Sequence, residues 1–456
     1  MLKRAVIFLF NFIHICMTIL PPVGAKARPN LWIDRNNSLD RLELTLAAAV
    51  AFLAPINAAR LPGIYITYAD ILAVSCLIVM ILNRGLPTRF FGPMTGAYLA
   101  GLLLFCGGLL LGSLVNGDML RGVIGIGQYF VAFLILPLVL LRRSRREAMI
   151  IAFAFLAAIV VVCLHGIIII SFNIDAGLGY ISYSRRLRGL VERENEFGGL
   201  LAMTVPLVIA LARDRMIPPF LAWIGLGGML YTVMLTGSNT GIISFAIGFL
   251  VTMLTGRNFL RDGALMAVIC VMVLASIASF GVEILPDVFE KRVVAALSEG
   301  DLEKLGSLAG RMELTNDALH LAQDYLFVGA GFDQYREVSL HQAPVHNIYL
   351  LALVEGGLVS LIGLGVILFA LSGQASLLIA HAQSYRAGIC LAVTVLVFAL
   401  VISALPHIYA RFLVLPWIVT LGIAMNPAQG IAAKRPLAVT GQRGRSKTRW
   451  RGGGDV

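Results

Sequence analysis

Charged residues are scarce in this sequence. They make up 13% of its 456 residues, about half of the roughly 25% that is usual in soluble proteins. So few charged side chains cannot cover the water-exposed faces of soluble domains of this length. The composition therefore excludes a cytosolic enzyme, a secreted disulfide scaffold and a disordered protein, and it predicts a chain that crosses a membrane repeatedly.

Paired cysteines are also lacking. The six cysteines all lie inside apolar runs, and none belongs to a Cys-x-x-Cys pair. Isolated cysteines in such runs are typical of small packing residues, not of disulfides or metal ligands. The sequence has no HExxH motif and no Cys/His cluster, so we expect no bound metal ion and no other cofactor.

Signatures of nucleotide-driven chemistry are absent too. There is no P-loop, no dinucleotide fingerprint, no DxD motif and no GxSxG nucleophile elbow. Acidic residues in apolar segments are few, mainly Asp70 and Glu355, whereas ion-coupled transporters usually carry more. These absences argue against nucleotide-driven or ion-coupled transport, and we expect no nucleic acid as a partner.

Long apolar runs are what the sequence has in abundance. A helix needs about 20 apolar residues to cross the hydrocarbon core of a bilayer. We therefore predict an all-α integral membrane protein with about twelve transmembrane helices. The predicted segments are 42–59, 64–82, 94–115, 122–141, 148–172, 197–212, 216–235, 240–256, 264–285, 346–372, 388–405 and 412–425.

These segments divide the chain into an N-terminal segment, a first helical part, a long loop, a second helical part and a tail: 1–41, 42–285, 286–345, 346–425 and 426–456. The short apolar run 5–20 fits a signal peptide as well as an interfacial or extra helix. We expect the long loop to form a large periplasmic helical region. The basic, glycine-rich tail is predicted to be disordered, cytoplasmic and able to contact membrane lipids.

The strongest basic cluster between two predicted helices is Arg142, Arg143, Arg145 and Arg146. Because cytoplasmic loops are enriched in Lys and Arg, this cluster sets the orientation and puts loops 173–196 and 286–345 on the outer side. Both outer loops nevertheless hold several basic residues. This excess indicates an anionic partner, although nearby carboxylates are an alternative source of pairing: Glu192, Glu194, Glu196, Asp287, Glu290 and Glu313.

A family resemblance rests on stretches that follow one another along the chain. They read RLRGLVERENEFGGLLAMTVPL, LTGSNTGIISF, GRMELTNDALHLAQDYLFVGAGFDQY and VHNIYLLALVEGGLVSLIGLG. Together, over about residues 185–365, they resemble the bacterial O-antigen ligase and polysaccharide polymerase superfamily. One position departs from the pattern, since the family often has Ser-Arg where this chain has Ser238-Asn239, and a possible phosphate-binding charge is lost.

The resemblance implies a metal-independent glycosyltransferase of the bacterial inner membrane whose active site faces the periplasm. The implied donor is a glycan linked to undecaprenyl diphosphate. The implied acceptor is a lipid A core sugar for a ligase or another lipid-linked glycan for a polymerase. Catalytic roles fall to His346, Arg188 and Arg311, and substrate binding to Arg292, Asn347, Asn195 and Arg185.

These residue types suit the implied chemistry. Negative charge grows on the diphosphate as its bond to the sugar breaks, and arginines can stabilise that charge. A histidine can take the proton of the acceptor hydroxyl near neutral pH. His346 is the first candidate for this base, and His320 and His341 are weaker ones.

Other features of the outer loops have more than one interpretation. Gly329 and Gly331 mark a turn more readily than a phosphate cradle. Aromatic residues could stack on sugar faces or simply pack: Tyr180, Tyr183, Phe332 and Tyr335. The alternative function is a transporter or flippase of lipid-linked oligosaccharide, which would need its cationic cavity inside the helix bundle.

Overall fold

The computed structural model describes residues 38–60, 66–172, 174, 179–256, 289–290 and 308–426. These residues form helices joined by loops, with two isolated β-bridges, Arg60–Thr67 and Ile181–Leu187, and no longer strand among them. The predicted fold class, an all-α protein, is thus confirmed. Within these residues, seven helices are long and apolar enough to cross a membrane. The count of about twelve spans stays a prediction.

Most predicted spans within the described residues coincide with helices to within a few residues, and 264–285 lies outside them. Two spans differ more. The helix predicted over 42–59 ends at Leu53, because Pro55 disfavours helical backbone in the residue before it, and the helix predicted over 346–372 is longer. The helices are α2 (Ser38–Leu53), α3 (Tyr68–Arg84), η1 (Gly92–Met94), α4 (Thr95–Val115), α5 (Met119–Phe130), η2 (Val131–Ile135), α6 (Leu136–Leu140), α7 (Arg145–Ser171), η3 (Gly189–Val191), α8 (Glu194–Arg213), α9 (Pro219–Thr236), α10 (Asn239–Leu254), α14 (Leu308–Asp324), α15 (Tyr335–Val338), α16 (Ile348–Ala380), α17 (Tyr385–Ile402) and α18 (Arg411–Ala424).

The longer helix is α16, which continues past residue 372 to Ala380. The sequence favoured an earlier end because polar residues such as Gln374 interrupt the apolar run. Gln374 is buried, and its amide lies beside Gly92 at the start of η1. A protein neighbour, instead of lipid, therefore accommodates this polar side chain, and the helix can continue.

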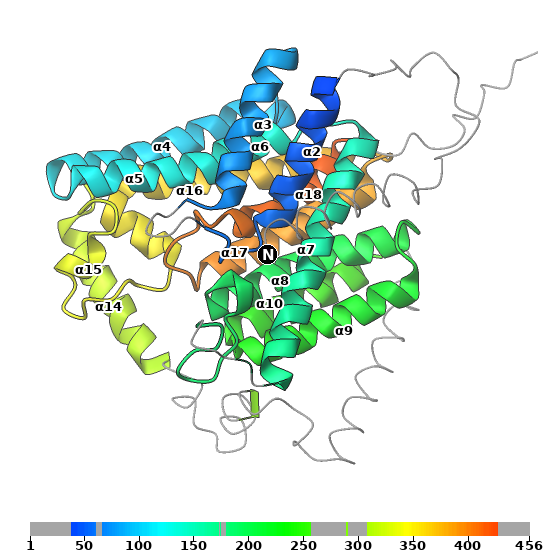
Figure 1. Ribbon diagram of the computed structural model, residues 1–456. Coiled ribbons are helices and arrows are strands. Elements are labelled where there is room, and N and C mark those ends of the chain that lie inside the picture. The colour runs from blue at the N-terminus through cyan, green and yellow to red at the C-terminus, as the bar shows by residue number, and fades with distance from the viewer. Residues whose placement is uncertain are drawn as a thin grey trace, which may run out of the picture.

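The helices pack in three groups around α17 and α18 (Figure 1). One group contains α2, α3 and α7, the second α4, α5 and α16, and the third α8, α9 and α10. α14 and α15 pack on α16 at one end of the second group. Nearly every residue of α18 is buried, so this helix serves as the common core of the bundle.

Small residues bring α4 and α16 into backbone contact. A Cβ atom added to Gly108 would lie 2.5 Å from the carbonyl oxygen of Gly356, and one added to Gly101 would lie 2.8 Å from the amide nitrogen of Ile367. Ser360 of α16 donates a 2.8 Å hydrogen bond to the carbonyl of Phe105 in α4. Close approach through small residues is how membrane helices gain packing energy where lipid supplies no hydrophobic drive. This pairing fixes α16, whose N-terminal end carries His346.

The middle of the fourth predicted span, 122–141, is a π-turn, η2, between α5 and α6. Pro137 lacks an N–H, so the carbonyl of Phe133 loses its helical partner. Tyr98 of α4 donates a 2.6 Å hydrogen bond to this carbonyl. A neighbouring helix thus satisfies the freed backbone group, as the apolar environment requires.

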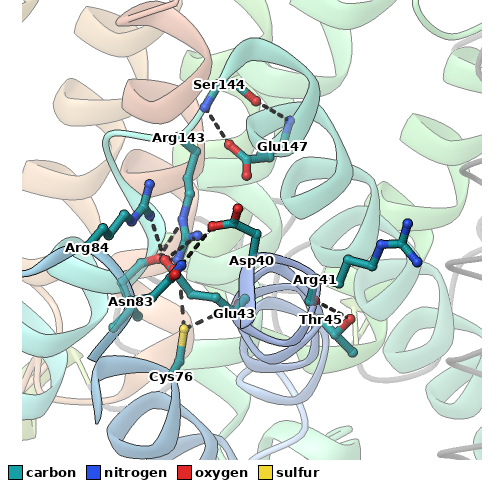
Figure 2. A network of polar contacts seen from close by, with 11 residues as sticks. Asp40, Arg41, Glu43, Thr45, Cys76, Asn83, Arg84, Arg143, Ser144 and Glu147 are labelled. Atoms are coloured by element: carbon teal, nitrogen blue, oxygen red, sulfur yellow. Dashed lines mark hydrogen bonds and ion pairs between the residues drawn. The ribbon is translucent and has the colours of Figure 1, made fainter. Parts of the chain in front are cut away.

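A buried polar network ties α2, α3 and the segment before α7 together (Figure 2). The carboxylate of Glu43 lies 2.6 Å from Arg143 and 2.6 Å from Arg84, and it accepts a 3.2 Å hydrogen bond from Asn83. Glu43 is 1% exposed and Arg143 is 3% exposed. Of the arginine cluster at 142–146, at least Arg143 therefore points into the protein instead of toward lipid headgroups.

We expect Glu43→Ala to destabilise the fold, because it leaves the buried charge of Arg143 without its carboxylate. Removing one member of a buried pair typically costs about 3–5 kcal/mol. The thermal unfolding temperature of the detergent-solubilised variant measures this loss. A matched control is Asp214→Ala, which breaks an exposed pair with Arg386 (3.6 Å) that should contribute little. Equal unfolding temperatures for the two variants would contradict a stabilising role for Glu43.

Candidate active site

Loops that are distant in sequence meet at one end of the bundle. Asn57, after α2, donates a 2.8 Å hydrogen bond to Glu192, and Arg60 lies 3.1 Å from the same carboxylate. Asp333, before α15, lies 3.7 Å from His407, before α18. The segment 54–60 thus contacts the loop before α8, and the loop between α14 and α16 contacts the one between α17 and α18.

The arginine-rich stretch before α8 begins as a small hairpin. Ile181 and Leu187 form an antiparallel bridge, and the amide of Arg188 donates a 2.8 Å hydrogen bond to the carbonyl of Tyr180. Leu187 is fully buried, and its amide bonds the carbonyl of Leu235 at the end of α9, which anchors the hairpin. Arg185 lies at the exposed tip with a φ of 57°.

The arginines of this stretch do not all point the same way. Arg186 reaches the carbonyl of Thr236 at 2.8 Å and Oδ1 of Asn195 at 2.7 Å, so Asn195 is held by protein. Arg188 pairs with Glu194 at 3.1 Å and Arg193 with Glu196 at 3.3 Å. Pairing within the loop, the alternative that the sequence left open, therefore does occur. The side chains of Arg188 and Arg193 are still 43% and 58% exposed.

Two adjoining cavities open beside these arginines. The Arg188 cavity, about 490 Å³, is lined by Arg60, Tyr180, Arg188, Glu192 and Arg193 with small residues between them. The Tyr409 cavity is smaller, about 90 Å³, and shares Arg60, Glu192 and Arg193 with it. Its other walls include Gln128, Glu196, His407, Tyr409 and Arg411. Arg193 thus lies where the two cavities meet.

His346 lies just before the first residue of α16 and is half-buried. Its Nδ1 atom is buried and has no hydrogen-bond partner among the described residues. Burial lowers the pKa of His346, and the positive charges of Arg311 and Arg193 lower it further, against the nearby carbonyl of Pro344. The imidazole is therefore held in its neutral, proton-accepting form. The structure thus brings two predicted residues, His346 and Arg311, under each other's electrostatic influence.

Helix α14 carries Arg311 and is docked on the following segment. The Tyr335 hydroxyl donates to the Asp317 carboxylate at 2.9 Å and Ser339 donates to it at 2.6 Å. The Tyr335 hydroxyl also lies 3.0 Å from the carbonyl of Leu314, one turn after Arg311. These contacts position the arginine relative to the segment that leads into His346. His320, on the same helix, and His341 are exposed.

The VGAGF stretch packs against a break in α16. Gly357 has a φ of 67°, and the amides of Ala330 and Gly331 bond the carbonyls of Val354 and Glu355 at 2.8 and 2.9 Å. A side chain at Gly329 would overlap the carbonyl of Glu355, so only glycine allows this approach. Gly329 and Gly331 therefore allow the loop to pack closely on α16, and this packing places Asp333 at the site. Their role in the structure is that of packing residues, as the sequence favoured, instead of a phosphate cradle.

His407 is a site residue that the sequence analysis did not identify. It is 7% exposed, and its ring lies 5.4 Å from those of Phe332 and Tyr409. Burial lowers the pKa of His407, and Asp333 opposes that shift. Asp333 is also paired with Arg336 at 2.6 Å. The available signal was the position of this histidine in the short loop before the last predicted span, since His346 also lies where a loop meets a predicted span.

The remaining predicted residues have local roles or lie outside the description. Asn347 caps α16, since its Oδ1 accepts hydrogen bonds from Tyr349 and Leu350 at 3.0 and 3.3 Å. Any glycan contact by Asn347 would therefore use its amide nitrogen. Arg292 lies outside the described residues. Within the described ranges, no three His, Cys, Asp or Glu side chains gather as metal ligands, and metal independence stays a prediction.

Comparison with known proteins supports the resemblance seen in the sequence. Residues 224–365 match the family model described as O-antigen ligase. The matched region begins in α9 and ends within α16, so it includes Arg311, His346 and the VGAGF stretch. No curated protein matches the chain. The predicted resemblance to the O-antigen ligase and polymerase superfamily is thus confirmed over residues 224–365.

Proposed function

From the match of residues 224–365 to the O-antigen ligase family, we propose that this chain transfers a lipid-linked glycan without a metal ion. The donor is a glycan on undecaprenyl diphosphate, and the acceptor is a sugar hydroxyl of the lipid A core or of another lipid-linked glycan. The observation that carries this proposal is the setting of His346, which is half-buried and whose buried Nδ1 atom has no hydrogen-bond partner among the described residues. Burial and then the charges of Arg311 and Arg193 lower its pKa.

The Arg188 cavity suits the diphosphate of the donor. Arg60, Arg188 and Arg193 line it with side chains that are 41%, 43% and 58% exposed. A guanidinium has five N–H donors, more than one carboxylate can use, so each of these arginines can also bind phosphate oxygen. Charge grows on the diphosphate as the sugar leaves, and these contacts strengthen in the transition state.

His346 supplies the base in this proposal. Its neutral imidazole accepts the proton of the acceptor hydroxyl while that oxygen attacks the anomeric carbon and the diphosphate departs. Burial, with the charges of Arg311 and Arg193, lowers the pKa of His346 and favours the neutral imidazole, and the guanidinium of Arg311 is a further candidate for stabilising the diphosphate. In this proposal His346 thus supplies the base, and Arg311 helps to stabilise the departing diphosphate.

We propose that Arg186 stands in for the arginine that is missing at Asn239. Its Nε atom donates a 2.8 Å hydrogen bond to the carbonyl of Thr236, close in sequence to Asn239 at the start of α10. An arginine from the preceding loop therefore reaches the segment where the family often has one. The departure at Asn239 thus does not leave this segment without a neighbouring guanidinium.

The active site faces the periplasm in this proposal, and the arginine cluster at 142–146 faces the cytoplasm. Reporter fusions after Arg146 and Arg215 are expected to give cytoplasmic signals. Fusions near Gly189 and Gly310 are expected to give periplasmic signals, because both positions precede candidate site residues. A cytoplasmic signal at Gly189 or Gly310 would contradict transfer from a donor in the outer leaflet.

The direct test is transfer by the purified protein. We expect turnover of a lipid-linked glycan donor to persist in EDTA, because arginines instead of a metal ion neutralise the diphosphate. Offering a lipid A core acceptor in one reaction and only lipid-linked glycan in another distinguishes a ligase from a polymerase. Loss of turnover in EDTA with recovery in magnesium or manganese would contradict the metal-independent mechanism. ATP-independent movement of intact donor across vesicles without transfer would instead indicate a flippase.

A further inference from the structure

We propose that the Tyr409 cavity binds an uncharged sugar ring of a glycan substrate, with His407 as a hydrogen-bonding residue and Tyr409 as the stacking surface. This inference rests on the proposed glycan transfer and adds to it a sugar-binding subsite outside the matched residues 224–365. Two sources supply such a ring, namely the phosphate-linked sugar of the donor and the sugar that carries the acceptor hydroxyl.

The charges around the Tyr409 cavity are mutually compensated. Arg411 binds Asp70 through two contacts of 2.5 and 2.8 Å and also donates to Gln128 at 2.8 Å. The side chains of Arg411 and Asp70 are each only 7% exposed. The guanidinium of Arg411 is therefore already hydrogen-bonded, and it cannot bind a phosphate in place of Asp70 without breaking a buried ion pair.

The other charged residues of the cavity are paired as well. Arg60 lies 3.1 Å from Glu192, and Arg193 lies 3.3 Å from Glu196. Unlike the Arg188 cavity, this one has both carboxylates, Glu192 and Glu196, in its own lining. Three arginines and three carboxylates, counting Asp70, therefore surround this cavity, whereas the Arg188 cavity has three arginines and one carboxylate in its lining. The Tyr409 cavity thus attracts an anion less strongly and still offers hydrogen bonds to hydroxyl groups.

An aromatic surface completes the cavity. The ring of Tyr409 is stacked with that of His407 at 5.4 Å and meets the ring of Tyr129 edge-on at 5.5 Å. Phe332 lies 6.2 Å from Tyr409 on another side. Rings fixed in this way present an apolar face to the C–H groups of a sugar while their polar atoms can reach hydroxyls.

His407 is held in orientation by a short chain of contacts. Its Nε2 atom lies 3.7 Å from Asp333, and Asp333 pairs with Arg336 at 2.6 Å. The backbone amide of Tyr335 donates to Glu355 at 3.3 Å, which ties this turn to the break in α16. Because the ring is fixed before substrate arrives, a hydrogen bond to a sugar costs less conformational entropy.

The position of the cavity fits a sugar next to a diphosphate. Arg60, Glu192 and Arg193 belong to both cavities, so a ring in the Tyr409 cavity directly adjoins a phosphate bound in the Arg188 cavity. The charge of Arg193 acts on both His346 and His407. The subsite is therefore close to the proposed base, where either the donor sugar or the acceptor sugar must lie.

The test compares His407→Ala and Tyr409→Leu with His381→Ala and Tyr385→Leu. The two control residues are exposed and flank the short loop between α16 and α17, at the opposite end of α16 from His346. KM is measured once with donor varied and once with acceptor varied. Binding of a polyprenyl diphosphate without sugar is measured separately. Tyr409→Leu keeps an apolar side chain, so it carries the test if His407→Ala does not fold.

We expect KM for one substrate to rise about tenfold in both site variants, as the loss of a hydrogen bond or a stacking contact predicts. A rise for the donor assigns the cavity to the phosphate-linked sugar, and a rise for the acceptor assigns it to the acceptor sugar. Binding of the sugar-free diphosphate should stay at the wild-type level.

Two results would overturn the subsite. One is an unchanged KM for both substrates in folded site variants, and the other is weaker binding of the sugar-free diphosphate, which would make the cavity a phosphate site. Failure of the proposed function looks different, because wild-type protein and both controls would then show no transfer at all.

Discussion

His346→Gln is expected to lose about a hundredfold or more of the transfer rate, and to be as inactive as His346→Ala. Glutamine can reproduce a hydrogen bond of the imidazole, but it cannot accept a proton at neutral pH. Donor affinity should change little, because the arginines that bind diphosphate remain. Turnover and donor binding are measured on purified variants, with His381→Ala as the control.

Substantial turnover by His346→Gln would mean that this residue only positions a substrate. The base would then have to be sought among His320, His341, His407 and the carboxylates of the outer loops.

The pH dependence of the reaction supplies a separate test of the same residue. Burial and the charges of Arg311 and Arg193 lower the pKa of His346 below its ordinary value of about 6.5. A general base works in its neutral form, so activity should fall in acid with a midpoint below that value. An acid limb at a higher pH would argue against His346 as the titrating base.

Arg311→Ala is expected to have the second large effect, a loss of about 2–4 kcal/mol of transition-state stabilisation. Arg311→Lys should recover little of the rate, since it keeps the charge but loses the planar fork that matches phosphate oxygens. Arg188→Ala should also remove most of the transfer. The control is Arg386→Ala, because Arg386 is exposed in the first turn of α17, at the opposite end of α16 from His346. Near-normal transfer in both Arg311→Ala and Arg188→Ala would contradict the diphosphate-binding role.

The two Arg311 variants should differ in their pH profiles although both are slow. Alanine removes a positive charge near His346, so the pKa of the imidazole should rise and the acid limb should move to higher pH. Lysine keeps the charge, so the limb should stay near its wild-type position. Identical profiles would mean that Arg311 does not act on His346 electrostatically.

The sequence by itself determined the class of the fold and the places of most helices. A run of apolar residues long enough to cross a bilayer can be recognised from the local sequence alone, without knowing which segments pack against it. The positions of His346 and of the arginine-rich loop were visible for the same reason. The end of α16 was predicted too early, because burial of Gln374 beside Gly92 depends on another helix.

Only the tertiary structure decided which charges meet. Arg411 and Asp70 are 341 residues apart in sequence, and the partner of Arg143 is Glu43 on another helix. Nothing in the local sequence predicts such pairs, because they depend on how the helices pack. The same holds for His407 and Asp333, and for Arg193 between the two cavities. Hydrophobic length therefore determined the helices, whereas helix packing determined the surroundings of the candidate active site.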